Sequence, residues 1–324
     1  MNFTIRSLAL GLPGTLMVLC ACGGPPSSPA ISQLLPAFSA VGWHLARDSA
    51  TLKCRTLDDA EHPRHNWLIG INQVQGISGY FIGKGSDRAV YYVTVPPYRQ
   101  HDYRYYRYPR GVTITSGIGR EVSGYIVHPE KLNGVWGFIK KNKVWTLFRD
   151  PNEGHGKYAV TEILGFNSSR VAVGFYVDRS GADVPFELNV ITGSFASLKP
   201  PGAASAQATG INGKGDVVGW FTGPSGTKGF ILRASTYQVF SYPKSTSTQA
   251  LGLNWQDQIV GSYVDTSGVT HGFLLSGPVS HPQWQSFDNP KAKGFTTLNG
   301  INNHDDLVGN YFDNVGNTHG FLCR

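Results

Sequence analysis

Short apolar runs alternate with turn-forming residues along most of the chain. In Val217–Phe221 bulky apolar residues surround a glycine, and polar segments rich in Asn, Asp and Gly stand on both sides. Apolar runs of four to eight residues bounded by such turns predict β-strands, and no stretch after the first thirty residues shows helical periodicity. The strands are apolar on both faces, so both faces of each sheet must be covered. The pattern predicts an all-β protein of stacked sheets.

One motif recurs six times. The clearest copies span Glu162–Leu188, Gln207–Leu232, Gln249–Leu275 and Thr296–Leu322, and two weaker copies precede them. A glycine within an apolar run marks the same point of each copy, namely Gly79, Gly124, Gly174, Gly219, Gly261 and Gly309. Its spacing of roughly 42–50 residues is that of a four-stranded propeller blade.

Each repeat divides into four predicted strands, A to D. Strand A ends in a Gly-Ile-Asn-like sequence, and its Asn suits the turn into strand B because Asn accepts left-handed conformations. The glycine inside strand B indicates the close approach of a neighbouring backbone. Strand B stops at an Asp-x-x-Gly turn such as Asp265–Gly268, strand C reads Gly-Phe-Leu as in Gly272–Leu274, and strand D alternates bulky residues as in Tyr237–Pro243.

The last repeat ends after strand C, and the segment before the first repeat resembles a spare strand D. Residues 50–59 match the pattern of Gln283–Asp288. Pairing of the two ends would close a ring without leaving an open sheet edge. The sequence therefore predicts a six-bladed β-propeller over residues 50–324, in which an N-terminal strand completes the last blade. Cys54 and Cys323 would then lie on neighbouring antiparallel strands, close enough to form a disulfide in an oxidising compartment.

The repeat pattern Gly-Ile-Asn, then Val-Gly-x-[Tyr/Phe]-x-Asp-x-x-Gly, then His-Gly-Phe resembles the HAF-type extracellular repeats of bacteria. The likeness covers about Leu68 to Leu322 and is strongest in the last four copies. It implies a β-propeller outside the cytoplasm and transfers no catalytic residue.

The first residues resemble an export signal. Leu8–Leu19 is an apolar run too short to span a bilayer, and Leu19-Cys20-Ala21-Cys22 resembles a bacterial lipobox. This predicts a signal peptide over residues 1–21, lipidation of Cys22, and a flexible tether over residues 22–49. Gly23 in place of Asp implies an outer-membrane lipoprotein, and an ordinary secretory signal is the alternative.

Composition narrows the class of protein without naming an activity. The 324 residues include 40 Gly and 19 Pro, only 15% are charged, and the net charge is +7. These values exclude a coiled coil and a polytopic membrane protein, and the positive charge favours anionic partners. The sequence has no zinc spacing, phosphate loop or serine-nucleophile elbow, so it predicts no metal and no cofactor.

Several polar residues are candidates for chemistry. His271 and His319 follow Asp265 and Asp313 by six residues, and their recurrence favours a hydrogen bond that holds the B–C turn over acid–base catalysis. Asp-x-Ser-Gly has too few carboxylates for Ca²⁺. The segment Tyr98–Arg110 interleaves Arg with Tyr, which suits either stacking on sugars or bases, or an outer strand D whose charges discourage edge pairing.

Strand polarity places all D–A connections and B–C turns at one mouth of the propeller, called here the D–A mouth. The candidate ligand residues of these connections are His62, Arg64, His65, Arg110, Glu153, His155, Lys157, Lys244, Lys291 and Lys293. Their charge predicts a mouth for an anionic polymer or glycan, with a solvated loop face as the alternative. Nucleic acid is not favoured, and the oligomeric state is left open. We expect a non-catalytic binding or scaffolding module; the competing hypothesis is a lyase or hydrolase that uses Glu153 and His155.

Overall fold

The computed structural model describes residues 52–62, 65–82, 89–106, 112–118, 121–127, 133–156 and 159–324. All of them belong to one compact unit, Ala46–Arg324. The predicted signal peptide, Cys22 and nearly all of the tether lie outside the described residues, as do Arg64, Arg110 and Lys157.

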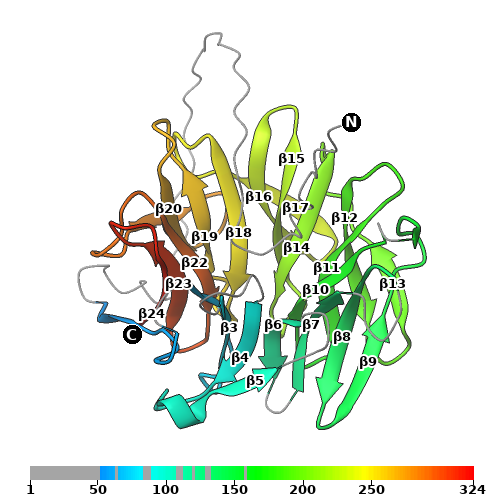
Figure 1. Cartoon of the computed structure of the whole chain (residues 1–324). Coiled ribbons are helices and arrows are strands. Elements are labelled where there is room, and N and C mark those ends of the chain that lie inside the picture. The colour runs from blue at the N-terminus through cyan, green and yellow to red at the C-terminus, as the bar shows by residue number, and fades with distance from the viewer. Residues whose placement is uncertain are drawn as a thin grey trace, which may run out of the picture. The chain divides into compact units, whose positions relative to one another are not determined.

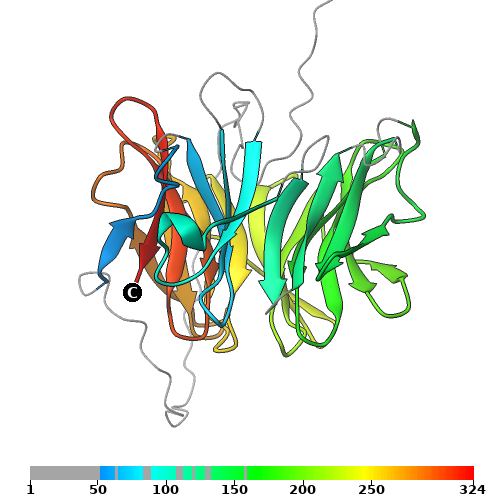
Figure 2. The ribbon, with the colours of Figure 1, turned by 60° about the horizontal axis from the view of Figure 1, so that its bottom comes forward.

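The described chain is built almost wholly of antiparallel strands, which succeed one another around a common centre (Figures 1 and 2). Repeat 1 comprises β2 (Asn66–Ile71), β3 (Ile77–Ile82), β4 (Ala89–Thr94) and β5 (Arg104–Tyr106), with a short 3-10 helix, η2 (Gln100–Asp102), before β5. Repeat 2 comprises β6 (Val112–Ile118), β7 (Glu121–Val127), β8 (Val135–Lys141) and β9 (Val144–Phe148). Repeat 3 comprises β10 (Thr161–Phe166), β11 (Val171–Val177), β12 (Asp183–Asn189) and β13 (Ser194–Ser197).

The later repeats follow the same order. Repeat 4 comprises β14 (Ser205–Ile211), β15 (Val217–Gly223), β16 (Gly226–Arg233) and β17 (Thr236–Phe240). Repeat 5 comprises β18 (Ser247–Leu253), β19 (Ile259–Val264), β20 (Thr270–Ser276) and β21 (Gln283–Phe287). Repeat 6 comprises β22 (Thr296–Ile301), β23 (Leu307–Phe312) and β24 (Thr318–Cys323), and it pairs with the N-terminal β1 (Cys54–Thr56).

Hydrogen bonding groups these strands into four four-stranded sheets and one eight-stranded sheet. The large sheet holds repeats 4 and 5, which are joined by the single parallel residue pair Thr227 and Ser247. An all-β β-propeller arrangement is therefore confirmed.

The glycine of strand B faces an aromatic ring of strand C in every repeat. Gly261, for example, lies opposite Phe273, and Gly309 lies opposite Phe321. A Cβ on Gly261 would lie 1.9 Å from the carbonyl oxygen of Gln249 and 2.8 Å from the Phe273 ring. The expected close approach of a backbone is thus confirmed, and the backbone belongs to strand A of the same sheet. The six strand-C rings are essentially inaccessible: Tyr92, Phe138, Phe186, Phe230, Phe273 and Phe321 are each 0% exposed.

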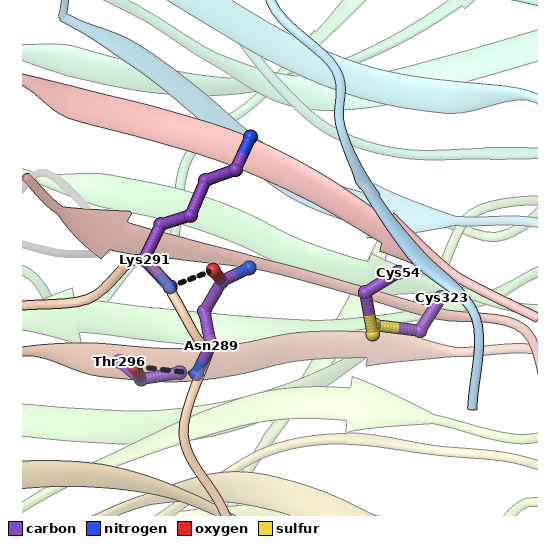
Figure 3. Close-up of a disulfide and its surroundings, with 5 residues drawn as sticks. All are labelled: Cys54, Asn289, Lys291, Thr296 and Cys323. Atoms are coloured by element: carbon purple, nitrogen blue, oxygen red, sulfur yellow. Dashed lines mark hydrogen bonds between the residues drawn. A yellow bond between two sulfur atoms is a disulfide. The ribbon is translucent and has the colours of Figure 1, made fainter. Parts of the chain in front are cut away.

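Strand β1 lies beside β24, with Cys54 opposite Cys323 (Figure 2). The two cysteines form a disulfide with a Cα–Cα distance of 4.0 Å (Figure 3). The predicted disulfide is confirmed. The chain on either side of it is also paired, because Lys53 and Arg324 exchange backbone hydrogen bonds.

Candidate functional site

The β9–β10 and β21–β22 connections share one construction that fixes their shape. The second residue after strand D gives its backbone N–H to a side chain at the start of strand A: Asp150 donates to Thr161 Oγ1 at 3.0 Å, and Asn289 donates to Thr296 Oγ1 at 3.2 Å. The side chain of the same residue accepts the amide two positions later, as Asn289 Oδ1 does from Lys291 at 3.0 Å (Figure 3). The second bond makes an Asx turn, and the first ties the connection to strand A of the next repeat.

Exposed lysines lie in these and other D–A connections. Lys244 lies in the β17–β18 connection, and Lys291 and Lys293 lie in the β21–β22 connection. All three are exposed, and none has a carboxylate partner among the described residues. Lys199 in the β13–β14 connection adds a fourth exposed cation that sequence reasoning missed; its place in a D–A connection was the available signal.

The other predicted residues of the mouth have different surroundings. His62 is half-buried, stacks on Phe81 at a centroid distance of 4.0 Å and contacts Asp59, whereas His65 and His155 are exposed. Glu153 is only 4% exposed; its carboxylate accepts a hydrogen bond from Thr161 and forms an ion pair with Arg149. The structure therefore gives Glu153 a part in the loop scaffold and does not bring it together with His155 in any described contact.

Each of the two repeated histidines lies between two carboxylates. His271 Nδ1 is 2.9 Å from Asp288, and its Nε2 is 3.4 Å from Asp265. His319 Nδ1 is 2.7 Å from Asp58, and its Nε2 is 3.2 Å from Asp313. The expected link to the B–C turn is present, and each ring also reaches an aspartate just beyond strand D.

Electrostatics distinguish His319. Burial alone would lower its pKa, but the hydrogen bonds and negative charges of Asp58 and Asp313 outweigh burial and raise the pKa above its usual value. Because Asp58 follows β1 and His319 lies on β24, this contact ties the N-terminal segment to the last repeat.

The B–C turns bring acidic residues to the same mouth. Asp178, Asp265 and Asp313 each accept backbone amides of their own turns, and Ser267 Oγ also donates to Asp265. These hydrogen bonds lower the pKa of Asp265 to about 2. The mouth is therefore less uniformly basic than the loop residues alone predict, although its carboxylates are engaged locally.

Several cations on the opposite face, at the A–B and C–D turns, are paired, although Lys143 is in no described ion pair. Lys141 and Arg170 bind Glu121, while Lys214 and Arg233 bind Asp257 at 3.1 and 3.2 Å. Arg324 lies 3.5 Å from Asp306. Both faces thus carry lysine and arginine. Lys244, Lys291 and Lys293 of the D–A mouth form no ion pair among the described residues, although Lys291 Nζ donates to Thr56 Oγ1 at 3.4 Å.

The described part of the Arg/Tyr segment packs against the joined ends of the chain. Tyr98 is 8% exposed, with the guanidinium groups of Arg55 and Arg324 within 5.3 and 5.6 Å of its ring centroid. Tyr103 is 7% exposed and donates to the carbonyl of Asp58. These rings are occupied by internal packing, and β5 is an outer strand, in agreement with the second interpretation of this segment.

Neither a metal cluster nor a membrane-spanning helix is found in the part of the chain that the structure describes. No group of three or more His, Cys, Asp or Glu side chains there is arranged to hold a metal ion. No described helix has the length and apolar character needed to cross a bilayer.

Comparison with known proteins supports the fold alone. No family model matches the chain, and no curated protein is similar to it. Among solved structures, it resembles TolB from Acinetobacter baumannii with a TM-score of 0.52 and 6% identity, over 82% of this chain and 65% of TolB. It resembles AofleA from Arthrobotrys oligospora with a TM-score of 0.51 and 9% identity, over 84% of this chain and 86% of AofleA. The chain thus spans less than two thirds of TolB, and both likenesses concern the propeller fold.

Proposed function

We propose that the protein is a cell-envelope binding or scaffolding module, non-catalytic, built on a closed six-bladed propeller. Six blades follow if the eight-stranded sheet is divided at its single parallel pair, Thr227 and Ser247. A β-bulge recurs at the same point of strand A in each of the six repeats, which supports counting six equivalent units. Strand β1 would then complete the last blade, as its pairing with β24 suggests.

The ligand that we propose is an anionic polymer or glycan at the D–A mouth. The observation that carries this is the group of exposed lysines on the D–A connections. Lys244, Lys291 and Lys293 form no ion pair among the described residues, whereas on the opposite face Lys141, Lys214 and Arg233 are paired and Lys53 and Lys143 are not. Unpaired cations on rigid loops attract anions without first breaking an ion pair. The competing lyase or hydrolase hypothesis has less support, because the Glu153 carboxylate is already bound to Arg149 and Thr161.

A binding measurement tests this proposal. Polygalacturonate and polyphosphate are titrated against the protein at 50 and 300 mM NaCl; we expect saturable binding that weakens as salt screens the lysines. The double substitution Lys291→Glu and Lys293→Glu should weaken binding at least tenfold. The charge-matched control is Lys53→Glu with Lys143→Glu, two exposed lysines on the other face. Absence of binding, or equal loss in both double variants, would contradict the proposal.

We also propose that the module is an outer-membrane-anchored lipoprotein. The support is the lipobox-like Leu19–Cys22 and the HAF-type repeat pattern. Labelling of cells with a palmitate analogue should mark the protein, and Cys22→Ser should abolish the label. A label that persists in this variant would instead indicate another site of acylation.

A further inference from the structure

A pocket of about 430 Å³ lies on the face of the A–B and C–D turns, between repeats 2 and 3. Repeat 2 contributes the start of strand B and the C–D turn, and repeat 3 contributes its A–B turn. Small-molecule sites usually measure about 300–1,000 Å³, so the pocket has room for a ligand of monosaccharide size. Its polar lining residues are Glu121, Lys141, Asn142, Asn167, Ser168 and Arg170.

The pocket lies where repeat 2 has a shortened A–B connection. Only two residues separate β6 from β7, whereas four or five separate strands A and B in the other repeats. At the second position of this connection repeat 5 has Trp255, whose ring lies against the turn of repeat 4, because a Cβ on Gly213 would be 2.5 Å from it. Repeat 3 has the small Ser168 at that position. The short connection and the small side chain together account for the space.

Two cations in the pocket share one carboxylate. Glu121 lies 2.9 Å from Lys141 Nζ and forms a second ion pair with Arg170, whose guanidinium carbon is 5.2 Å from the ring centroid of Phe166. Burial alone would raise the pKa of Glu121, but the hydrogen bonds and positive charges of Lys141 and Arg170 outweigh burial and lower this pKa. Glu121 is therefore ionised at neutral pH, and one positive charge is left over without any ion pair having to break.

Arg170 brings a charge that its turn does not need. Its backbone amide donates to the carbonyl of Asn167, and its φ is 66°. The residues with the same amide bond and a positive φ in other repeats are neutral or acidic, namely Gln75, Gly215, Asp257 and Asp305. The turn therefore forms without a cation at this position, and repeat 3 has its cation beside the pocket.

The pocket also holds a backbone acceptor that is capped in the other turns. The side-chain amide of Asn167 donates to the carbonyl of Asn212 in the next repeat at 3.0 Å, and the same bond continues from Asn212 to Asn254, Asn302 and Asn72. Repeat 2 has Gly119 in place of this asparagine. Among the described residues, the Asn167 carbonyl accepts only the backbone amide of Arg170. It can therefore accept one more donor.

We propose that this pocket binds a small hydroxylated carboxylate, of the class of a uronic-acid residue, with its carboxylate on Arg170 and Lys141 and a hydroxyl donating to the Asn167 carbonyl. Guanidinium has five N–H donors and ammonium has three, so both cations keep donors beyond those that Glu121 uses. The planar guanidinium matches a carboxylate in particular. The site lies on the face opposite the lysines of the D–A mouth and does not rest on polyanion binding there.

Sugars that differ only at C6 test the class of ligand. Glucuronate, glucose and glucose 6-phosphate, and the matching galactose series, are titrated into ¹⁵N-labelled protein at 50 mM NaCl while the amide signals of Asn142 and Ser168 are followed by NMR. At least one uronate should shift both signals saturably and bind at least tenfold more tightly than its neutral sugar. It should also bind more tightly than the phosphate ester, whose second negative charge exceeds the single surplus charge of the pocket and repels Glu121.

Substitutions taken from the other repeats then locate the site. Arg170→Gln introduces the residue that repeat 1 has at this turn position, with a φ of 60° at Gln75, and should weaken uronate binding at least tenfold. Ser168→Trp introduces the residue of repeat 5, keeps every charge and should fill the pocket, with a similar loss. Lys143→Gln removes a charge from the same C–D turn outside the pocket and should stay within about twofold of wild type. Thermal melts verify that each variant is folded.

Three results would overturn the proposal. One is the absence of saturable shifts at Asn142 and Ser168 with either uronate. Another is binding of the neutral sugar or the phosphate ester as tight as that of the uronate. The third is uronate binding that survives Arg170→Gln and Ser168→Trp but is lost in Lys291→Glu with Lys293→Glu, which would place the sugar acid at the D–A mouth. Polymer binding by the Arg170→Gln variant is expected to be unchanged, so the two sites fail or succeed separately.

Discussion

Loss of the Cys54–Cys323 disulfide should destabilise the propeller strongly. The bond joins residues separated by 269 positions, so it restricts nearly the whole unfolded chain of this unit. The chain-entropy model gives about 5 kcal/mol for a loop of this length, as an upper value. For a unit of this size each kcal/mol corresponds to about 2–4 °C in the unfolding temperature. We therefore expect the double variant Cys54→Ser, Cys323→Ser to melt about 10 °C or more below the oxidised protein.

The loss should be concentrated at the joined ends. Without the disulfide, β1 is held to β24 by three residue pairs, by the backbone bonds between Lys53 and Arg324, and by the contact of Asp58 with His319. Local opening of β1 should therefore precede global unfolding.

Calorimetry with and without reductant, together with hydrogen exchange of the β1 amides, measures both effects. Reductant should lower the melting temperature of the wild type and leave the double variant unchanged, which controls for effects on other cysteines. The reasoning is refuted if reduced and oxidised wild type melt within about 2 °C of each other and the β1 amides keep their protection.

Three further predictions concern the contacts between and within repeats. The pKa of His319 is raised in the folded state, so its contribution to stability is complete below the unfolded pKa of about 6.5 and is lost as pH rises through the folded pKa. Thermal melts from pH 5.5 to 9 should therefore show a declining melting temperature. His319→Gln should remove this decline, and His155→Gln should not. Asn254→Ala leaves the buried backbone amide of Gln258 unbonded and removes one of the two hydrogen bonds to the carbonyl of Asn302, and should cost about 2–4 kcal/mol in urea unfolding; the exposed Asn189→Ala should cost less than about 1 kcal/mol. Gly261→Ala places a Cβ 1.9 Å from the Gln249 carbonyl and should yield little folded protein; a wild-type circular dichroism spectrum and melting temperature would contradict the close approach.

Residue periodicity was sufficient to predict the strands because each repeat pairs mostly with itself. The glycine of strand B, the Asp-x-x-Gly turn and the Cys54–Cys323 pair follow from local spacing and strand order. Contacts between repeats were harder to predict. Asn254 was recognised as a turn residue, but its donation to Asn302 depends on how one repeat stacks on the next.

The sequence predicted the candidate-site residues that lie in D–A connections. Lysines such as Lys291 were placed correctly in a D–A connection, and the sequence also suggested Glu153, whose carboxylate the fold uses internally.

The disulfide also determines how the propeller would bear mechanical load. Tension applied through the chain before Leu52 reaches β1 first, and this strand of three residues would peel from β24 if hydrogen bonds alone held it. The Cys54–Cys323 bond instead passes the load covalently to β24, which is paired with β23 as well as β1. In a molecule tethered by its N-terminal segment, shear on a bound ligand would therefore be carried into the last sheet without first detaching its N-terminal strand.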